Sequence, residues 1–280
     1  MRFICNSLIA LLTLLCSHSS VAYERAISLA PHITELIYAI GAQDKLIATV
    51  KSSDYPPAAK QLPRVGDGIS VSAERLLALS PDVIFAWQPT RALQALESTL
   101  KSSQIALHYI NPLTVDQIGT AALDLGHWLN RTETAQQFSQ HWQQRLHQLE
   151  QRYHTPHPKT VFIVLNSHPL HSINDSLSQD VLRICGAQNW AQHSPTVAPA
   201  IHLEQLLATP FSDLVYSQKD EALEQLIELL ERAYARPLRT HQVQADHFYR
   251  AGPRLLEVTA QLCAQLEAQA EKRVFSTKGD

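Results

Sequence analysis

The sequence contains little glycine and none of the common catalytic or phosphate-binding motifs. Eight glycines occur in 280 residues, and neither the P-loop pattern nor GxGxxG is present. The GxSxG pattern of serine hydrolases and the HExxH pattern of zinc peptidases are absent as well. The sequence therefore offers no local motif for nucleotide binding, for an activated serine or for zinc catalysis.

An excess of charge and a membrane-spanning run are also lacking. The formal net charge is −3, which indicates neither a nucleic acid nor an anionic membrane as a partner. The longest apolar run, residues 8–16, is much shorter than the roughly 20 residues that span a bilayer. The length and the 45% hydrophobic content fit a globular protein of one large domain or two lobes.

Residues 1–22 have the pattern of a cleaved export signal. Arg2 supplies the positive start, residues 8–16 the apolar core, and residues 20–22 a small-x-small cleavage site. Cleavage would leave Cys185 and Cys263 as the cysteines of a soluble exported chain. Their even number in an oxidising compartment favours a disulfide, and two buried thiols are the alternative. Their spacing excludes a CxxC redox site and a cysteine zinc cage.

A single long helix is predicted over residues 130–153. Asn130 is a candidate N-cap, with Glu133 three residues later as in a capping box. Apolar residues then recur at steps of three and four, and two prolines at positions 156 and 158 end the pattern. A helix of this length spans roughly 35 Å, which suits a strut between two bodies. The alternative is a surface helix of one large domain.

Two short internal repeats flank this helix in the same order. Residues 71–84 are echoed by residues 201–215, and residues 40–44 by residues 185–189. Strand and helix patterns alternate on both sides, which predicts mainly parallel sheets with right-handed crossovers. The predicted fold is α/β, with two lobes joined by one long interdomain helix and a ligand cleft between the lobes. The expected parts are an N-terminal lobe over 23–129, the helix over 130–153, and a C-terminal lobe over 154–280.

Four loops at the carboxyl ends of predicted strands are the candidate binding elements. They begin at Ser52, Trp87, Ser167 and Asp246, and ligands of open α/β sheets bind at such ends. Residues 246–250 combine a carboxylate, aromatic faces and a guanidinium, which suits a flat ligand with polar edges. The plainer interpretations are ordinary surface loops and a helix-capping loop with surface aromatics.

Histidine is the one residue type in surplus, at 14. His168 and His171 could place two imidazoles on one metal, so a secreted metal-dependent enzyme is one hypothesis. Polar loop histidines are the simpler interpretation, and we predict no metal site. His168 alone is expected to face the cleft, because it follows the carboxyl end of a strand.

Several ordered motifs resemble a known transport family. The runs ISLAPHITEL (27–36), SDYPP (53–57), LPRVG (62–66) and LSPDVI (79–84) are similar to those of periplasmic substrate-binding proteins of ABC importers for cobalamin, haem and iron siderophores. Residues 246–250, the following Pro253 and Arg254, and the pair Cys185 and Cys263 resemble the cobalamin-binding branch. The resemblance implies a rigid interdomain helix and binding without catalysis. It also implies a periplasmic protein, monomeric when free, that delivers cobalamin to a permease dimer in the inner membrane.

The resemblance also implies roles for individual residues. No cofactor is expected beyond the transported cobalamin, and haem or a ferric siderophore is the alternative ligand within the same fold. Ser52, Gly68 and Ala198 stand where the cobalamin binders carry aromatic residues. Glu74 and Glu204, one in each repeat, would dock onto the permease; the alternative is local stabilisation of a helix N-terminus. The expected ligand-binding residues are Ser52, Ser53, Trp87, His168, Asp246, His247, Phe248, Tyr249 and Arg250.

Overall fold

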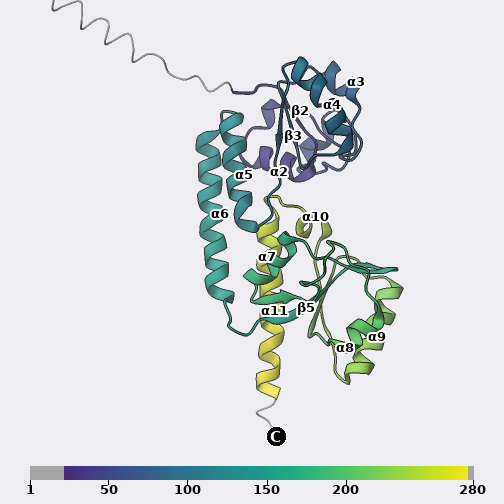
Figure 1. Cartoon of the computed structure of the whole chain (residues 1–280). Coiled ribbons are helices and arrows are strands. Elements are labelled where there is room, and N and C mark those ends of the chain that lie inside the picture. The colour runs from purple at the N-terminus through teal and green to yellow at the C-terminus, as the bar shows by residue number, and fades with distance from the viewer. Residues whose placement is uncertain (1–21, 277–280) are drawn as a thin grey trace, which may run out of the picture.

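The protein consists of two α/β lobes beside a pair of long helices (Figure 1). The computed structural model describes residues 22–276, with side-chain burial as far as residue 268. The predicted export signal, apart from Ala22, lies outside the described residues. Within them, no helix is both long enough and apolar enough to cross a membrane.

The N-terminal lobe contains a four-stranded, wholly parallel sheet in the order β2-β1-β3-β4. Its strands are β1 (Ala26–Ser28), β2 (Leu46–Ala48), β3 (Val83–Ala86) and β4 (Ala106–Tyr109). Its helices are α2 (Pro31–Ala39), α3 (Ala73–Ala78), α4 (Arg91–Ser102) and α5 (Val115–Trp128), with short 3₁₀ turns at Gln43–Lys45 and Pro57–Gln61. Helices cover both faces of the sheet, so β3 is apolar at every position, and its alternate residues enter two separate hydrophobic clusters.

The C-terminal lobe contains a five-stranded sheet in which β6 alone is antiparallel. Its order is β6-β5-β8-β9, and β7 also pairs with β5. The strands are β5 (Lys159–Ser167), β6 (Leu170–Ser172), β7 (Ala187–Asn189), β8 (Asp213–Tyr216) and β9 (Arg239–Gln242). The helices are α7 (Ser176–Ile184), α8 (Leu203–Ala208), α9 (Glu221–Tyr234), α10 (Ala245–Phe248) and α11 (Leu255–Ser276).

The internal repeat corresponds to a structural duplication. The parallel order β2-β1-β3-β4 of one lobe matches β7-β5-β8-β9 of the other. The first echo falls on α3 and β3 in one lobe and on α8 and β8 in the other. The second falls on the ends of α2 and α7, where Gly41 and Gly186 adopt φ values of 72° and 65°. Only glycine adopts this backbone at low cost, so the echo preserves one turn geometry.

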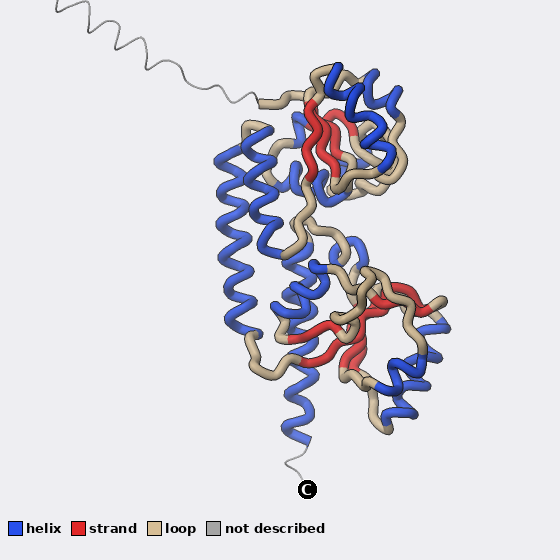
Figure 2. Tube along the Cα trace, in the orientation of Figure 1, coloured by secondary structure: helices blue, strands red, loops and turns tan. Residues whose placement is uncertain are grey.

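The predicted interdomain helix is α6 (Thr132–Tyr153), which runs from one lobe to the other (Figures 1 and 2). At its start, Arg131 donates to the Gly41 carbonyl at 3.0 Å and to both Asp44 carboxylate oxygens at 2.8 Å. At its end, Glu150 pairs with Arg183 of α7 at 2.8 Å. Each end of α6 is therefore bound to a different lobe, as a strut requires.

Some predicted boundaries are wrong. Asn130 is not the N-cap of α6: it has a φ of 54°, Arg131 is the cap, and no side chain caps this end. The anchoring of Arg131 to the N-terminal lobe replaces the predicted capping box. Val243 follows β9 instead of lying within it, and the loop predicted before the last helix contains α10. Strands β6 and β7 have three residues each, too few for a periodic signal.

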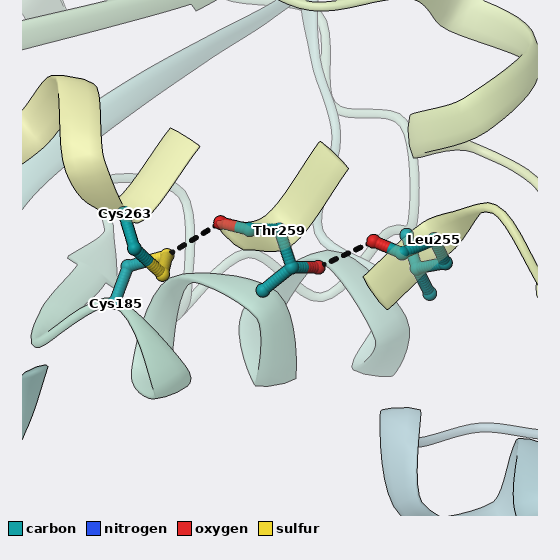
Figure 3. Close-up of a disulfide and its surroundings, with 4 residues drawn as sticks. All are labelled: Cys185, Leu255, Thr259 and Cys263. Atoms are coloured by element: carbon teal, nitrogen blue, oxygen red, sulfur yellow. Dashed lines mark hydrogen bonds between the residues drawn. A yellow bond between two sulfur atoms is a disulfide. The ribbon is translucent and has the colours of Figure 1, made fainter. Parts of the chain in front are cut away.

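Cys185 and Cys263 form the predicted disulfide (Figure 3). The bond joins the end of α7 to the middle of α11, and both residues are buried. Cys185 Sγ lies 3.6 Å from the Thr259 carbonyl oxygen, one turn earlier on α11. The bond therefore lies inside the C-terminal lobe and holds α11 against the end of α7.

We expect removal of this disulfide to lower the free energy of unfolding by roughly 4 kcal/mol, because it closes a loop 78 residues long. Urea unfolding of the wild type and of the Cys185→Ala, Cys263→Ala double variant would measure the loss. The double variant should also lose the sensitivity of the wild type to reductant. Two freely alkylated thiols in the unreduced protein would show that the bond does not form.

Candidate functional site: an apolar cleft between the lobes

A cavity of about 620 Å³ lies between the two lobes. On the N-terminal side it is lined by residues that follow the carboxyl ends of β1, β3 and β4, and by Ser52 and the turn at 67–69. On the other side it is lined by the end of β5, the start of α7 and the segment that precedes α11. The cavity thus lies at the predicted strand ends.

The lining of the cavity is dominated by exposed apolar side chains. Ile69 is 81% exposed, Val197 61%, Trp87 50%, Leu113 49% and Leu165 37%. These five are the majority of the nine large hydrophobic side chains that are exposed among the described residues. They come from both lobes and meet in one cavity. Grouping of this kind indicates a surface that is covered by a ligand with large apolar faces.

His32 and Trp87 form the polar part of the N-terminal wall. The Trp87 indole donates to Asn111 Oδ1 at 2.6 Å, and its ring meets His32 edge-on with centroids 6.2 Å apart. His32 is 6% exposed, and its Nε2 lies 3.3 Å from the Ile110 carbonyl oxygen. Burial lowers the pKa of His32 to about 4, and the nearby Arg250 cation acts in the same direction. The imidazole is therefore neutral near pH 7.

An ionic network around the buried carboxylate of Glu35 joins the lobes at the edge of the cavity. Glu35 of α2 has a side chain only 1% exposed and accepts from Arg254 Nε at 2.8 Å and Nη2 at 2.6 Å. Arg250 donates to Glu35 at 3.2 Å and to Asp54 at 2.8 Å, and it pairs with Asp246 at 2.6 Å. Burial would raise the pKa of Asp54, but Arg250 outweighs this and holds the pKa below its usual value. Three carboxylates thus surround Arg250.

Four of the predicted binding residues line the cavity, namely Ser52, Trp87, Tyr249 and Arg250. Two others belong to the core. Ser53 is fully buried, with its Oγ 3.0 Å from Thr34 Oγ1 in a cluster of buried hydroxyls. Phe248 is 1% exposed and packs edge-on against Tyr249. Neither side chain is open to a ligand in this structure.

The remaining three predicted residues lie outside the cavity lining. Asp246 and His247 belong to α10, whose helical turn points successive side chains in different directions, so only part of the segment faces the cleft. Asp246 acts on the site through its ion pair with Arg250. His168 is exposed in the turn between β5 and β6, because the chain doubles back there into an antiparallel hairpin.

The structure also adds lining residues that the sequence interpretation missed, among them His32, Ile69, Asn111 and Val197. The available signal was an aliphatic residue inside a turn-rich polar loop, as at positions 69 and 197. Two of the three positions where the resembled branch carries aromatics, Ser52 and Gly68, do line the cavity. Within the described chain, no cluster of three or more His, Cys, Asp or Glu side chains could hold a free metal ion.

Glu74 and Glu204 occupy matching positions in the two lobes. Each lies in the first turn of its short helix, α3 or α8, and each is exposed. Neither lines the cavity. The structure thus presents an exposed carboxylate at the same point of the repeat in each lobe, away from the cleft.

The lowered pKa of His32 predicts a pH-dependent stability. The His32 imidazole binds a proton more tightly in the unfolded chain than in the folded protein. Its contribution to the free energy of unfolding is therefore fully present above pH 6.5 and is lost as the pH falls to about 4. The loss should reach about 3 kcal/mol. We expect urea unfolding of His32→Asn, measured at several pH values, to lack this component. Equal pH slopes in variant and wild type would contradict the assignment.

Comparison with known proteins identifies the family. The profile of the periplasmic binding protein family matches residues 27–233. A vitamin B12-binding protein of Photorhabdus laumondii is 35% identical over 254 residues, which cover 89% of this chain and 90% of that protein. The periplasmic vitamin B12 binding protein of Vibrio cholerae superposes with a TM-score of 0.76 at 30% identity, covering 88% of this chain and 97% of that one. The periplasmic heme binding protein of the same organism shares the fold, with a TM-score of 0.72 at 24% identity over 86% of this chain and 98% of that one. The chain belongs to the periplasmic binding protein family.

Proposed function

We propose that this protein captures cobalamin in the cleft between its lobes and delivers it to the permease of an ABC importer. It acts in the periplasm after removal of residues 1–22, and it binds without catalysing a reaction. The observation that carries this proposal is the convergence of five exposed apolar side chains from both lobes on one cavity. The vitamin B12-binding relatives support the choice of ligand.

The charges of the cleft favour cobalamin over haem. Arg250 is the one permanent cation among the lining residues, and Glu35, Asp54 and Asp246 already surround it. The other two charged lining residues, Asp67 and Asp175, are carboxylates, so they make the cleft more negative. Haem would bring two propionates into this environment without a free cation to pair with them. The rim of a corrin carries neutral amides, which need only hydrogen-bond partners.

The two lining carboxylates are themselves occupied by the backbone. Asp67 accepts from the backbone nitrogens of Ile69 and Ser70 at 2.9 and 2.8 Å. Asp175 caps α7 by accepting from the Ser178 nitrogen at 2.6 Å. They shape the cleft, while its apolar side chains remain free for the ligand. A binding site of this kind suits an uncharged ligand with broad apolar faces.

Trp87 should carry a large share of the affinity, because Ser52 and Gly68 supply no aromatic face beside it. We expect Trp87→Ala to weaken cyanocobalamin binding by about 2 kcal/mol, or roughly 30-fold. Titration calorimetry would measure this effect. Asp246→Ala removes one ion-pair partner of Arg250 and should weaken binding by a smaller amount. Tyr109→Ala is the matched control, since Tyr109 is 37% exposed and does not line the cavity.

Two results would contradict this assignment. Unchanged affinity in both Trp87→Ala and Asp246→Ala would mean that the ligand does not occupy this cleft. A visible absorption titration in which haemin binds and cobalamin does not would overturn the choice of ligand while retaining the family.

Delivery is assigned to Glu74 and Glu204. Two exposed carboxylates at matching points of a duplicated fold suit a permease built as a two-fold dimer, and charge pairing would orient the encounter. The helix dipole stabilises a carboxylate at one such helix start, typically by about 0.3–1 kcal/mol. That local effect does not explain why both lobes carry a glutamate at the same point of the repeat.

We expect the double variant Glu74→Ala, Glu204→Ala to abolish cobalamin uptake by cells while its affinity for cobalamin in solution stays at the wild-type value. Uptake of labelled cobalamin and calorimetry would be measured on the same variants. Glu133→Ala removes an exposed carboxylate from α6 and serves as the control. Normal uptake by the double variant would leave only the local role at the helix ends.

A further inference from the structure

The imidazole of His32 has a defined proton position. It lies in the first turn of α2, among the residues that line the cavity. Its Nε2 is 3.3 Å from the Ile110 carbonyl oxygen. A carbonyl oxygen can only accept a hydrogen bond, so Nε2 carries the proton in this contact. In the neutral ring, Nδ1 therefore carries the lone pair.

The second nitrogen of His32 has no hydrogen-bond partner among the described residues. Within the described chain, the His32 ring makes one hydrogen bond, from Nε2 to the Ile110 carbonyl oxygen. Nδ1 makes none. Among the described residues, two side-chain atoms are both unpartnered and sealed from solvent, namely His241 Nδ1 and Tyr249 Oη. His32 Nδ1 is not one of them. His32 lines the cavity and is 6% exposed, and its unpartnered Nδ1 is not sealed from solvent.

This arrangement is the one that metal-ligating histidines adopt. Such residues donate one ring N–H to a carbonyl or carboxylate, which orients the other nitrogen and raises its basicity. The described chain has no cluster that could retain a free ion. A single imidazole can still complete the coordination of a metal that arrives with its own equatorial ligands. The cobalt of a corrinoid is such a metal.

We propose that His32 Nδ1 coordinates the cobalt of a corrinoid bound in the cleft, in place of an exchangeable axial ligand. This inference rests on the proposed function. With aquacobalamin, the bond between cobalt(III) and the water oxygen breaks, a dative bond from Nδ1 to cobalt forms, and the water leaves. No proton is released, because Nδ1 carries none, and the oxidation state of cobalt does not change.

The surroundings of His32 hold the ring in one orientation. The Ile110 carbonyl fixes one edge, and Trp87 meets the ring at an interplanar angle of 84°. A Cβ added to Gly252 would lie 3.5 Å from His32 Cβ, so the segment between α10 and α11 packs closely against this residue. A ring held in this way loses little freedom on coordination. The protein should thus prefer corrinoids with a labile axial ligand to those with a firmly held one, such as cyanocobalamin.

The test compares aquacobalamin with cyanocobalamin on the wild-type protein, His32→Ala and His168→Ala. His168 is an exposed histidine outside the cavity and serves as the matched control. Wild type and His168→Ala should shift the visible spectrum of aquacobalamin toward that of its complex with free imidazole. His32→Ala should not, and its preference for aquacobalamin over cyanocobalamin should fall by roughly ten-fold or more. Free imidazole added to His32→Ala with bound aquacobalamin should restore the shift.

Three outcomes would overturn the inference. Aquacobalamin bound by the wild type with an unchanged spectrum would show binding without coordination. A spectral shift that persists in His32→Ala would place the ligating group elsewhere. Equal losses of affinity for both corrinoids in His32→Ala would reduce His32 to a packing role. Each of these leaves the proposed function intact, whereas failure of the wild type to bind either corrinoid would overturn both.

Discussion

The buried carboxylate of Glu35 is the constraint on which the arrangement of the lobes depends. A charge with 1% exposure is tolerated only when it is paired, and removal of one partner of such a pair typically costs about 3–5 kcal/mol. Its partners, Arg250 and Arg254, come from the other lobe, so separation of the lobes at this point would leave the carboxylate unpaired. This network therefore joins the lobes in addition to α6. The same network holds α2, whose first turn belongs to the N-terminal wall of the cleft.

Charge and apolar surface have separate tasks in this cleft. Asp67, Asp175 and Arg250 are each engaged by the protein itself, so they define loop shape and lobe contact. The large apolar side chains of the lining have no such ionic role, and five of them are exposed in the cavity. A ligand then gains affinity by covering apolar area and by hydrogen bonds at its rim. This division explains how a cleft rich in ionisable residues can suit an uncharged ligand.

The duplicated fold explains both the symmetry of the molecule and the places where it is broken. Both lobes use the same parallel strand order, and each presents one glutamate at the start of a short helix. The C-terminal lobe alone adds the antiparallel strand β6 and the disulfide to α11. The matching positions of the two glutamates suit a symmetric partner, while the asymmetric additions are confined to the C-terminal lobe.

Local pattern was enough to predict most elements, the repeat, the long helix and the cysteine pair, and the order of short motifs indicated the family. These features depend on residues a few positions apart, or on composition and compartment, so a linear chain displays them. Tertiary contacts decided which side chains face the ligand. Ser53 and Phe248 went into the core, His168 went to a hairpin tip, and His32 became part of the cleft wall. The ion pairs that join the lobes at the edge of the cleft, Glu35 with Arg250 and with Arg254, are 215 and 219 residues apart in the chain. No local periodicity records a contact over that separation, because only the packing of one lobe against the other brings the two partners together.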